Sequence, residues 1–358
     1  MRSEASRFAG LPRRAALAVL ALFAIVMTVS LWEPSPAHLK LAQQTAVKKD
    51  ADLALYRAIS TRVAQGESYY PVAADELRKG DYPLKPFLTF RLPTFAYLTA
   101  YAGPSGMMTL RWLLVLGTLY AWWARLAGTF VDPGRRVQGA LLVIAGLAVA
   151  VSNRHVQLHE FWAGTLLALS MALHRQDRWW PSLFMAACAL ALRELALPFV
   201  LLMAAFALFT RRWNESAAWG ALALIFAGGM WLHAREAAAV VLPGDPHSPG
   251  WASLGGWPEF LRFMHMTGPV RALPDWISAI LTVLSLFGWI SWKSRTGLFG
   301  ALLFLGYGLM FMLLGRPSNF YWGLMITPVF ALGLVFLPRA FGDLRAAIWP
   351  HQLDSKAD

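Results

Sequence analysis

The sequence has little charge and almost no cysteine. Only 15% of its 358 residues are Asp, Glu, Lys or Arg, against ~25% in an average soluble domain, while 57% are hydrophobic. This balance, with 17 Trp and 22 Phe, excludes a disordered chain, a coiled coil and a nucleic-acid-binding tail. The single cysteine, Cys188, excludes a disulfide within the chain. What remains is an oversized soluble core or a membrane protein.

The distribution of the missing charges decides between these two classes. Six spans of 17 to 22 residues contain no Asp, Glu, Lys or Arg at all: 15–32, 137–153, 216–234, 276–292, 296–315 and 317–338. A helix needs about 20 residues to cross ~30 Å of hydrocarbon. The sequence therefore predicts an all-α polytopic membrane protein. With shorter apolar segments included, we expect about ten transmembrane helices, at 15–33, 107–126, 137–152, 158–174, 180–193, 195–210, 217–234, 274–291, 297–314 and 319–337.

Arginine clusters between these segments predict the orientation. The net charge is +12, and basic residues beside a membrane indicate the cytoplasmic side and contact with membrane lipids, so no nucleic-acid partner is expected. Ten spans with every cluster inside place both termini in the cytoplasm of a bacterial inner membrane. We expect a single transmembrane module over 1–338, with periplasmic loops at 34–106 and 235–273, and a short cytoplasmic tail at 339–358.

Three segments within this scheme are unusual. Residues 50–66 carry apolar side chains at helical spacing, which predicts an amphipathic helix in the membrane interface or on the bundle. Residues 86–106 are apolar but broken by prolines and a glycine, so we expect an interfacial or re-entrant helix; if this segment spans instead, the count is eleven. The spans 180–193 and 195–210 are short, which predicts a shallow hairpin whose charged tip, Arg193-Glu194, is sunk below the outer surface.

The charges that do not anchor the cytoplasmic side gather near the predicted periplasmic boundary. They come from separate loops and helix ends, so a water-facing cavity lined by convergent charges accounts for them. Individual helix caps and lipid contacts are the alternative explanation. Within the first loop, Asp52 and Tyr56 are one helical turn apart and can face the same cavity.

The motifs of the first loop resemble those of GT-C membrane glycosyltransferases, especially relatives of protein mannosyltransferases and aminoarabinose transferases. The similar elements are the D-x-x-x-Y of residues 52–56, Gly66 followed by residues 69–71, residues 82–86, and Arg91-Leu92-Pro93. The chain departs from the family pattern in two of these elements. The second acidic residue is displaced to Asp50, and the Lys-Pro-Pro element is scrambled around Lys85. We also expect no C-terminal soluble domain.

The resemblance implies transfer of a sugar from a polyprenyl-phosphate-linked donor to a glycan, lipid or protein acceptor at the periplasmic face. It places the general base on the first-loop aspartate, which is Asp52 here, with Asp50 as the second candidate. The donor phosphate needs cationic partners, and guanidinium groups suit it. Some relatives use a divalent cation, but this sequence requires no cofactor. The expected substrate-binding residues are Tyr56, Lys85, Arg91, His159, Glu160, Arg193, Glu194, Arg316 and Asn319.

Other classes stay open at this point. His155, His159 and Glu160 have the order H-x-x-x-H-E, which differs from the H-E-x-x-H of zinc hydrolases, so no metal site is predicted. A transporter or flippase of a lipid-linked or small polar substrate would place polar residues on broken helices near the midplane. A non-catalytic subunit could keep the GT-C-like fold without the reaction.

Overall fold

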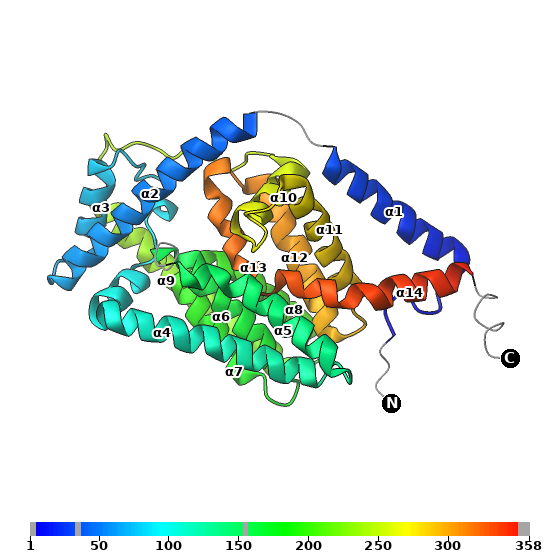
Figure 1. Cartoon of the computed structure of the whole chain (residues 1–358). Helices are drawn as coiled ribbons and strands as arrows, with labels where there is room; N and C mark the ends of the chain where they lie inside the picture. Colours follow the sequence, from blue (N-terminus) through cyan, green and yellow to red (C-terminus); the bar gives the residue numbers. More distant parts are fainter. Residues whose placement is uncertain (1–4, 33–36, 153–156, 350–358) are drawn as a thin grey trace.

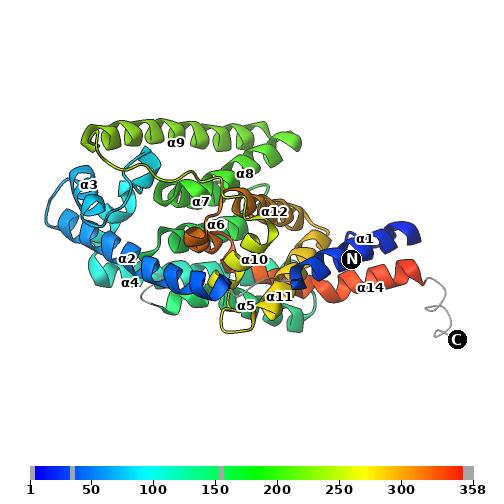
Figure 2. The same ribbon diagram turned by 90° about the horizontal axis from the view of Figure 1, so that it is seen from above.

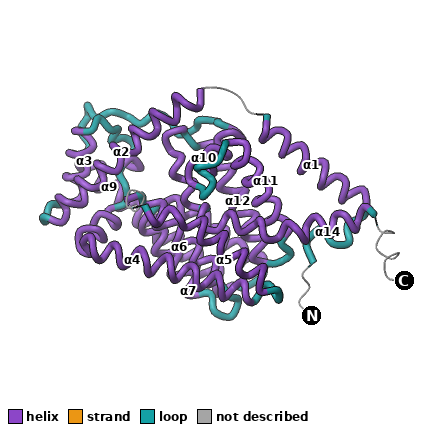
Figure 3. Tube along the Cα trace, viewed as in Figure 1, coloured by secondary structure: helices purple, strands orange, loops and turns teal. Residues whose placement is uncertain are grey.

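The computed structural model describes residues 5–32, 37–152 and 157–349, and over these residues the protein is helical, with no strand (Figure 1, Figure 3). This confirms the all-α prediction. The elements in chain order are α1 (Arg13–Leu31), α2 (Ala37–Ala64), α3 (Tyr69–Lys79), η1 (Phe87–Thr89), α4 (Pro93–Ala127), α5 (Pro133–Leu147), η2 (Ala148–Val151), α6 (His159–Leu173), α7 (Trp180–Leu192), η4 (Glu194–Ala196), α8 (Leu197–Phe209), α9 (Trp213–Val240), α10 (Gly256–Thr267), α11 (Asp275–Ser291), α12 (Arg295–Leu314), η5 (Pro317–Met325), α13 (Thr327–Phe330), η6 (Ala331–Phe336) and α14 (Leu337–Ile348).

Helices long and apolar enough to cross a membrane occur five times among the described residues: Arg13–Leu31, Pro133–Val151, Trp213–Val240, Arg295–Leu314 and Thr327–Ile348. In α1 and in α9, only 11% of the 18-residue apolar stretch is buried inside the protein, so these two helices expose their hydrophobic side chains along their length. A water-soluble protein does not leave such surfaces uncovered. These helices are compatible with a multi-pass membrane protein, whereas the ten spans and their orientation stay predictions.

Helix α6 lies in the interior of the bundle. Twelve of its fifteen residues are buried, and it packs against α4, α7 and η5. The contact with η5 needs a glycine, because a Cβ on Gly164 would collide with the backbone carbonyl of Leu324. This close approach of two backbones is typical of helix packing in membranes. It sets the position of η5 relative to the N-terminal end of α6.

The first and the last described helices are in contact. The first half of α1 packs against α14 at one edge of the bundle (Figure 1, Figure 2), and the rest of α1 runs away from α14 (Figure 1). Their interface is apolar, with Ala16 of α1 and Ala340 and Leu344 of α14 fully buried. Helix α14 continues to Ile348, so the first part of the predicted cytoplasmic tail, 339–358, is helical. Residues 350–358 lie outside the described part.

The first predicted loop is a small helical layer with its own core. Leu55, Ile59 and Val63 of α2 are buried in one cluster with residues of α3, so residues 50–66 lie within a helix, whereas their place in the membrane interface stays a prediction. The helix itself is longer than expected and begins at Ala37. Residues 93–102 continue into the helix expected at 107–126 through a kink at Gly103, whose φ of +63° is readily adopted by glycine. The proline-broken segment is thus the bent start of α4.

The second predicted loop is also partly helical and is attached to the first. Helix α9 extends to Val240, and α10 packs into the bundle through the buried side chains of Phe260 and Phe263. Arg78 of α3 forms an ion pair with Asp245, with 2.7 Å between Nη2 and Oδ2. Hydrogen bonds from Arg78 lower the pKa of Asp245 to about 2. This pair fixes the two segments to each other.

Candidate functional site

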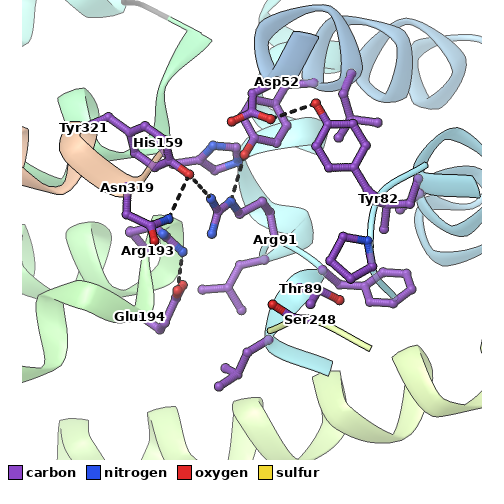
Figure 4. Close-up of a pocket in the computed structure, with 18 of the residues that line it drawn as sticks. Asp52, Tyr82, Thr89, Arg91, His159, Arg193, Glu194, Ser248, Asn319 and Tyr321 are labelled. Atoms are coloured by element: carbon purple, nitrogen blue, oxygen red, sulfur yellow. Dashed lines mark hydrogen bonds and ion pairs between the residues drawn. The ribbon is translucent and has the colours of Figure 1, made fainter. Parts of the chain in front are cut away.

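A cavity of about 350 Å³ lies where the helical layer of the first loop meets the bundle (Figure 4). We call it the Asp52 pocket. Its wall combines α2 and α3, the stretch 82–92, the start of α6, the turn between α7 and α8, the stretch 248–251, and the start of η5. Of the residues predicted from sequence, seven line it besides Asp52: Tyr56, Arg91, His159, Arg193, Glu194, Arg316 and Asn319.

Asp52 is buried on the pocket face of α2. The hydroxyl of Tyr82 donates a hydrogen bond to its Oδ1 at 2.7 Å. Burial raises the pKa of Tyr82, and the neighbouring carboxylate raises it further, so this phenol keeps its proton and acts as a donor. This hydrogen bond fixes the direction of the carboxylate.

The guanidinium of Arg91 donates its hydrogen bonds to neutral groups. Its Nε donates to the hydroxyl of Tyr56 at 3.0 Å and its Nη2 to the hydroxyl of Tyr321 at 3.2 Å. Its backbone carbonyl accepts a hydrogen bond from Tyr69 at 2.6 Å. Burial raises the pKa of Tyr56, which keeps that phenol uncharged. The positive charge of Arg91 is thus not cancelled by these two partners.

Arg193 differs from Arg91 because its partners are carboxylates. The side chains of Arg193 and Glu160 are each 1% exposed, and 2.6 Å separates Nε from Oε1. Its Nη1 also pairs with Glu194. At the charged tip of the α7–α8 hairpin, Arg193 is therefore buried, whereas the side chain of Glu194 is 24% exposed. Two carboxylates surround one guanidinium, so Arg193 is already neutralised.

Arg316 has long and neutral contacts. Its guanidinium lies 3.4 Å from Oδ1 of Asn319, 3.3 Å from the carbonyl of Pro249 and 3.5 Å from Oγ of Ser248. Asn319 in turn lies 3.5 Å from the hydroxyl of Tyr321. Contacts at these distances are weak, so a ligand oxygen can replace them at low cost.

His159 contributes an unsatisfied polar atom to the pocket. The imidazole is buried between the rings of Tyr56 and Phe95, at centroid distances of 5.0 and 4.5 Å. Its Nδ1 has no hydrogen-bond partner among the described residues. A buried polar atom without a partner is rare, and a bound ligand would supply one.

Two predicted residues, Lys85 and Glu160, do not line the pocket. The ammonium of Lys85 is outside the pocket and donates to the carbonyl of Pro243 at 2.8 Å. Glu160 lies behind the wall and touches it only through Arg193. Asp50 belongs to α2, but its side chain is outside the described part, as is the whole of His155.

Sequence reasoning missed several polar groups of this wall, among them Tyr82, Tyr321 and Ser248. Tyr82 lies in the similar element of residues 82–86 and Tyr321 in the span predicted at 319–337, but a phenol at either position can equally belong to the lipid interface. Ser248 lies in a segment rich in Pro and Gly and carried no signal. It reaches the pocket because Ser248 N donates to the carbonyl of Lys85 at 2.6 Å.

The pocket thus offers a held carboxylate, two guanidiniums with neutral partners and one neutralised guanidinium. In the described part of the chain no three His, Cys, Asp or Glu side chains are grouped to hold a metal ion. The arrangement suits removal of a proton beside an anionic group. Comparison with protein-family models, curated proteins and solved structures found no match.

Proposed function

We propose that this protein is an integral membrane glycosyltransferase that moves a sugar from a polyprenyl-phosphate-linked donor to an acceptor at the periplasmic face. The observation that carries this proposal is the buried, directed carboxylate of Asp52 in one cavity with Arg91 and Arg316. A lipid-linked donor also explains why the site belongs to a chain with membrane-spanning helices.

Asp52 acts as the general base. The acceptor hydroxyl attacks the anomeric carbon of the donor sugar and passes its proton to Asp52, while the bond from that carbon to the phosphate oxygen breaks. Tyr82 holds the carboxylate in place during the transfer. The new glycosidic bond and the free polyprenyl phosphate are the products.

Arg91 and Arg316 bind the donor phosphate. The hydrogen-bond partners of both are neutral, although Glu160 and Glu194 also attract the buried Arg91, and a guanidinium can donate two parallel hydrogen bonds to a phosphate. Arg193 has a different role, because Glu160 and Glu194 already neutralise it. It positions Glu194 at the pocket wall.

The direct test compares the envelope lipids and glycans of cells with and without this chain by mass spectrometry. We expect one component to lose the mass of a single sugar when the chain is absent, and this component identifies the acceptor. Restoring the wild-type chain should restore the mass, whereas the Asp52→Asn variant should not. An unchanged envelope would contradict the transferase proposal.

The same cells separate the other classes. A transporter or flippase moves its substrate across vesicles without forming a new glycosidic product, and a non-catalytic subunit keeps its effect when Asp52 is replaced by Asn. Neither alternative needs a fixed carboxylate beside two guanidiniums.

A further inference from the structure

A second cavity, of about 580 Å³, lies at the other ends of the helices that reach the Asp52 pocket. Helix α6 begins at the Asp52 pocket with His159 and ends at the second cavity, while α12 begins at the second cavity with Arg295 and ends beside Arg316. The 15 residues of α6 span ~22 Å at 1.5 Å per residue. We call this second cavity the Arg125 pocket.

The wall of the Arg125 pocket carries four guanidinium groups and one carboxylate, from Arg125, Arg175, Arg212, Arg295 and Glu215. The carboxylate is already paired. Its Oε2 lies 2.9 Å from Nη1 of Arg212, and its Oε1 lies 2.7 Å from Nε2 of His174. Three guanidiniums are left without a carboxylate on this wall.

Arg125 is the clearest case of a guanidinium without a carboxylate partner, because its side chain is half-buried. It donates to the carbonyl of Ala172 at 2.9 Å, to Oγ1 of Thr296 at 2.6 Å and to the carbonyl of His174. All three acceptors are neutral. A cation partly removed from water without a counter-ion is unfavourable, and an anion in the cavity would offset that cost.

Arg175 and Arg295 are the groups best able to reach such an anion. Both side chains are exposed. With the Gln176 amide turned so that its oxygen faces Arg295, Nε of Arg295 donates to that oxygen at 3.1 Å. The side chain of Arg175 forms no hydrogen bond or ion pair among the described residues; only its backbone carbonyl accepts one, from Arg178 N. Their guanidiniums can therefore turn toward a ligand without breaking an ion pair.

Part of the remaining wall is apolar. Met171, Met203, Phe206, Leu298 and Phe299 line it from α6, α8 and α12. A soluble anion would leave these side chains without a partner, whereas a phosphate attached to a hydrocarbon chain would cover them. The volume lies within the ~300–1,000 Å³ of ordinary ligand sites.

We propose that the Arg125 pocket binds the phosphate group of an anionic membrane lipid, in the leaflet opposite to the Asp52 pocket. Basic pockets between transmembrane helices recognise lipid head groups in this way. The four arginines come from four separate segments that the fold brings together at one end of the bundle. This site is distinct from the proposed transfer reaction and does not depend on it.

The test uses the purified full-length protein in neutral detergent and follows its thermal unfolding. Dioleoylphosphatidylglycerol, dioleoylphosphatidylcholine and inorganic phosphate are titrated separately, because a ligand of the folded state raises Tm with its concentration. The Arg175→Gln/Arg295→Gln double variant removes two of the three unpaired guanidiniums. The matched control is Arg178→Gln/Arg211→Gln, which removes two exposed arginines near the same end that do not line the cavity.

We expect phosphatidylglycerol to raise Tm of the wild type and of the control, and phosphatidylcholine to have a much smaller effect. The double variant should need at least ~20-fold more phosphatidylglycerol for the same rise, about fivefold for each basic residue lost near an anionic lipid. An equal loss in control and double variant would overturn the proposal, because the binding would then be general surface attraction.

Inorganic phosphate distinguishes the source of the anion. If it leaves Tm unchanged, or raises it equally in all variants, the lipid is the ligand. If inorganic phosphate alone reproduces the full effect and its dependence on Arg175 and Arg295, the lipid proposal is overturned in favour of a soluble phosphate. A Tm measured without ligand shows whether the double variant folds normally, since both substituted residues are exposed.

Discussion

The two cavities differ in what stands opposite their arginines. In the Asp52 pocket, Arg91 and Arg316 face hydroxyl, amide and carbonyl groups, and a separate carboxylate is held by Tyr82. In the Arg125 pocket the one carboxylate, Glu215, is already paired with Arg212. The first cavity can therefore remove a proton and bind an anion, whereas the second can only bind an anion.

The largest effect expected from this difference is that of Asp52→Asn. The amide keeps the shape but cannot accept a proton as a base, so the rate of transfer should fall ~10²–10⁴-fold while donor binding stays within a few-fold. The measurement is product formation with purified protein and a lipid-linked sugar donor, together with donor binding.

The control for this experiment is Asp75→Asn in α3, which removes a half-exposed carboxylate bonded to Arg62 and Lys79, outside the pocket. Its transfer rate should stay near that of the wild type. Full activity of Asp52→Asn would remove the base from the proposed mechanism, and a loss shared by the control would point to folding. Arg175→Gln/Arg295→Gln should leave transfer intact, because those residues lie in the other cavity.

The second prediction concerns stability. Arg193→Gln leaves the carboxylate of Glu160 buried without its cation, which should lower the free energy of unfolding by ~3–5 kcal/mol. Arg175→Gln in the Arg125 pocket removes an exposed side chain and should change it by less than ~0.5 kcal/mol. Denaturant or thermal unfolding in detergent measures both.

A double variant sharpens this second prediction. Replacing Glu160 by Gln together with Arg193→Gln removes both buried charges, so part of the lost stability should return. If Arg193→Gln alone is as stable as the wild type, the buried pair is not a structural requirement. Glu160 and Glu194, the partners of Arg193, would then be available to act on the substrate.

The sequence allowed the helical class and much of the Asp52 pocket to be predicted, because both follow from local patterns. Charge-free runs predict helices of membrane-spanning length, and the one-turn spacing of Asp52 and Tyr56 places both on one face. The length and polarity of the α7–α8 hairpin predicted a sunken charged tip, and Arg193 is buried. The bend at Gly103 was visible as a glycine before a proline, but its consequence, one helix over Pro93–Ala127, was not.

The remaining parts depend on contacts between distant segments. The Arg125 pocket joins residues near 125, 175, 212 and 295, and each cluster alone is typical of a cytoplasmic anchor. Lys85 was expected at the substrate, yet its ammonium binds a carbonyl of the second loop. No spacing within the chain could show that these two loops lie against each other.

The third prediction is a pH effect of Tyr82→Phe. The variant loses the hydrogen bond to Asp52 that favours the charged carboxylate, so the acidic limb of the pH–rate profile should move to higher pH. We expect a loss of only a few-fold near pH 8, where the base is still ionised, and a larger one near pH 5. The matched variant is Tyr120→Phe on the exposed surface of α4, whose profile should follow that of the wild type. A uniform loss at all pH values would show that Tyr82 acts only through packing.

The smallest effect is expected from the ion pair that fixes the second loop to the first. Because the pKa of Asp245 is lowered to about 2, its contribution to stability is present above the unfolded value of ~4 and is lost as the pH falls through about 2. Asp245→Asn should therefore lower Tm slightly and by a constant amount between pH 5 and 8, with the difference from the wild type closing below pH 4. The same variant also tests whether the two cavities are independent. The ion pair holds the segment that brings Ser248 to the Asp52 pocket, so Asp245→Asn should weaken donor binding there and leave phosphatidylglycerol binding at the Arg125 pocket unchanged.

Equal losses of binding at both cavities would mean that the two loops support the whole bundle. The two sites would then not be independent.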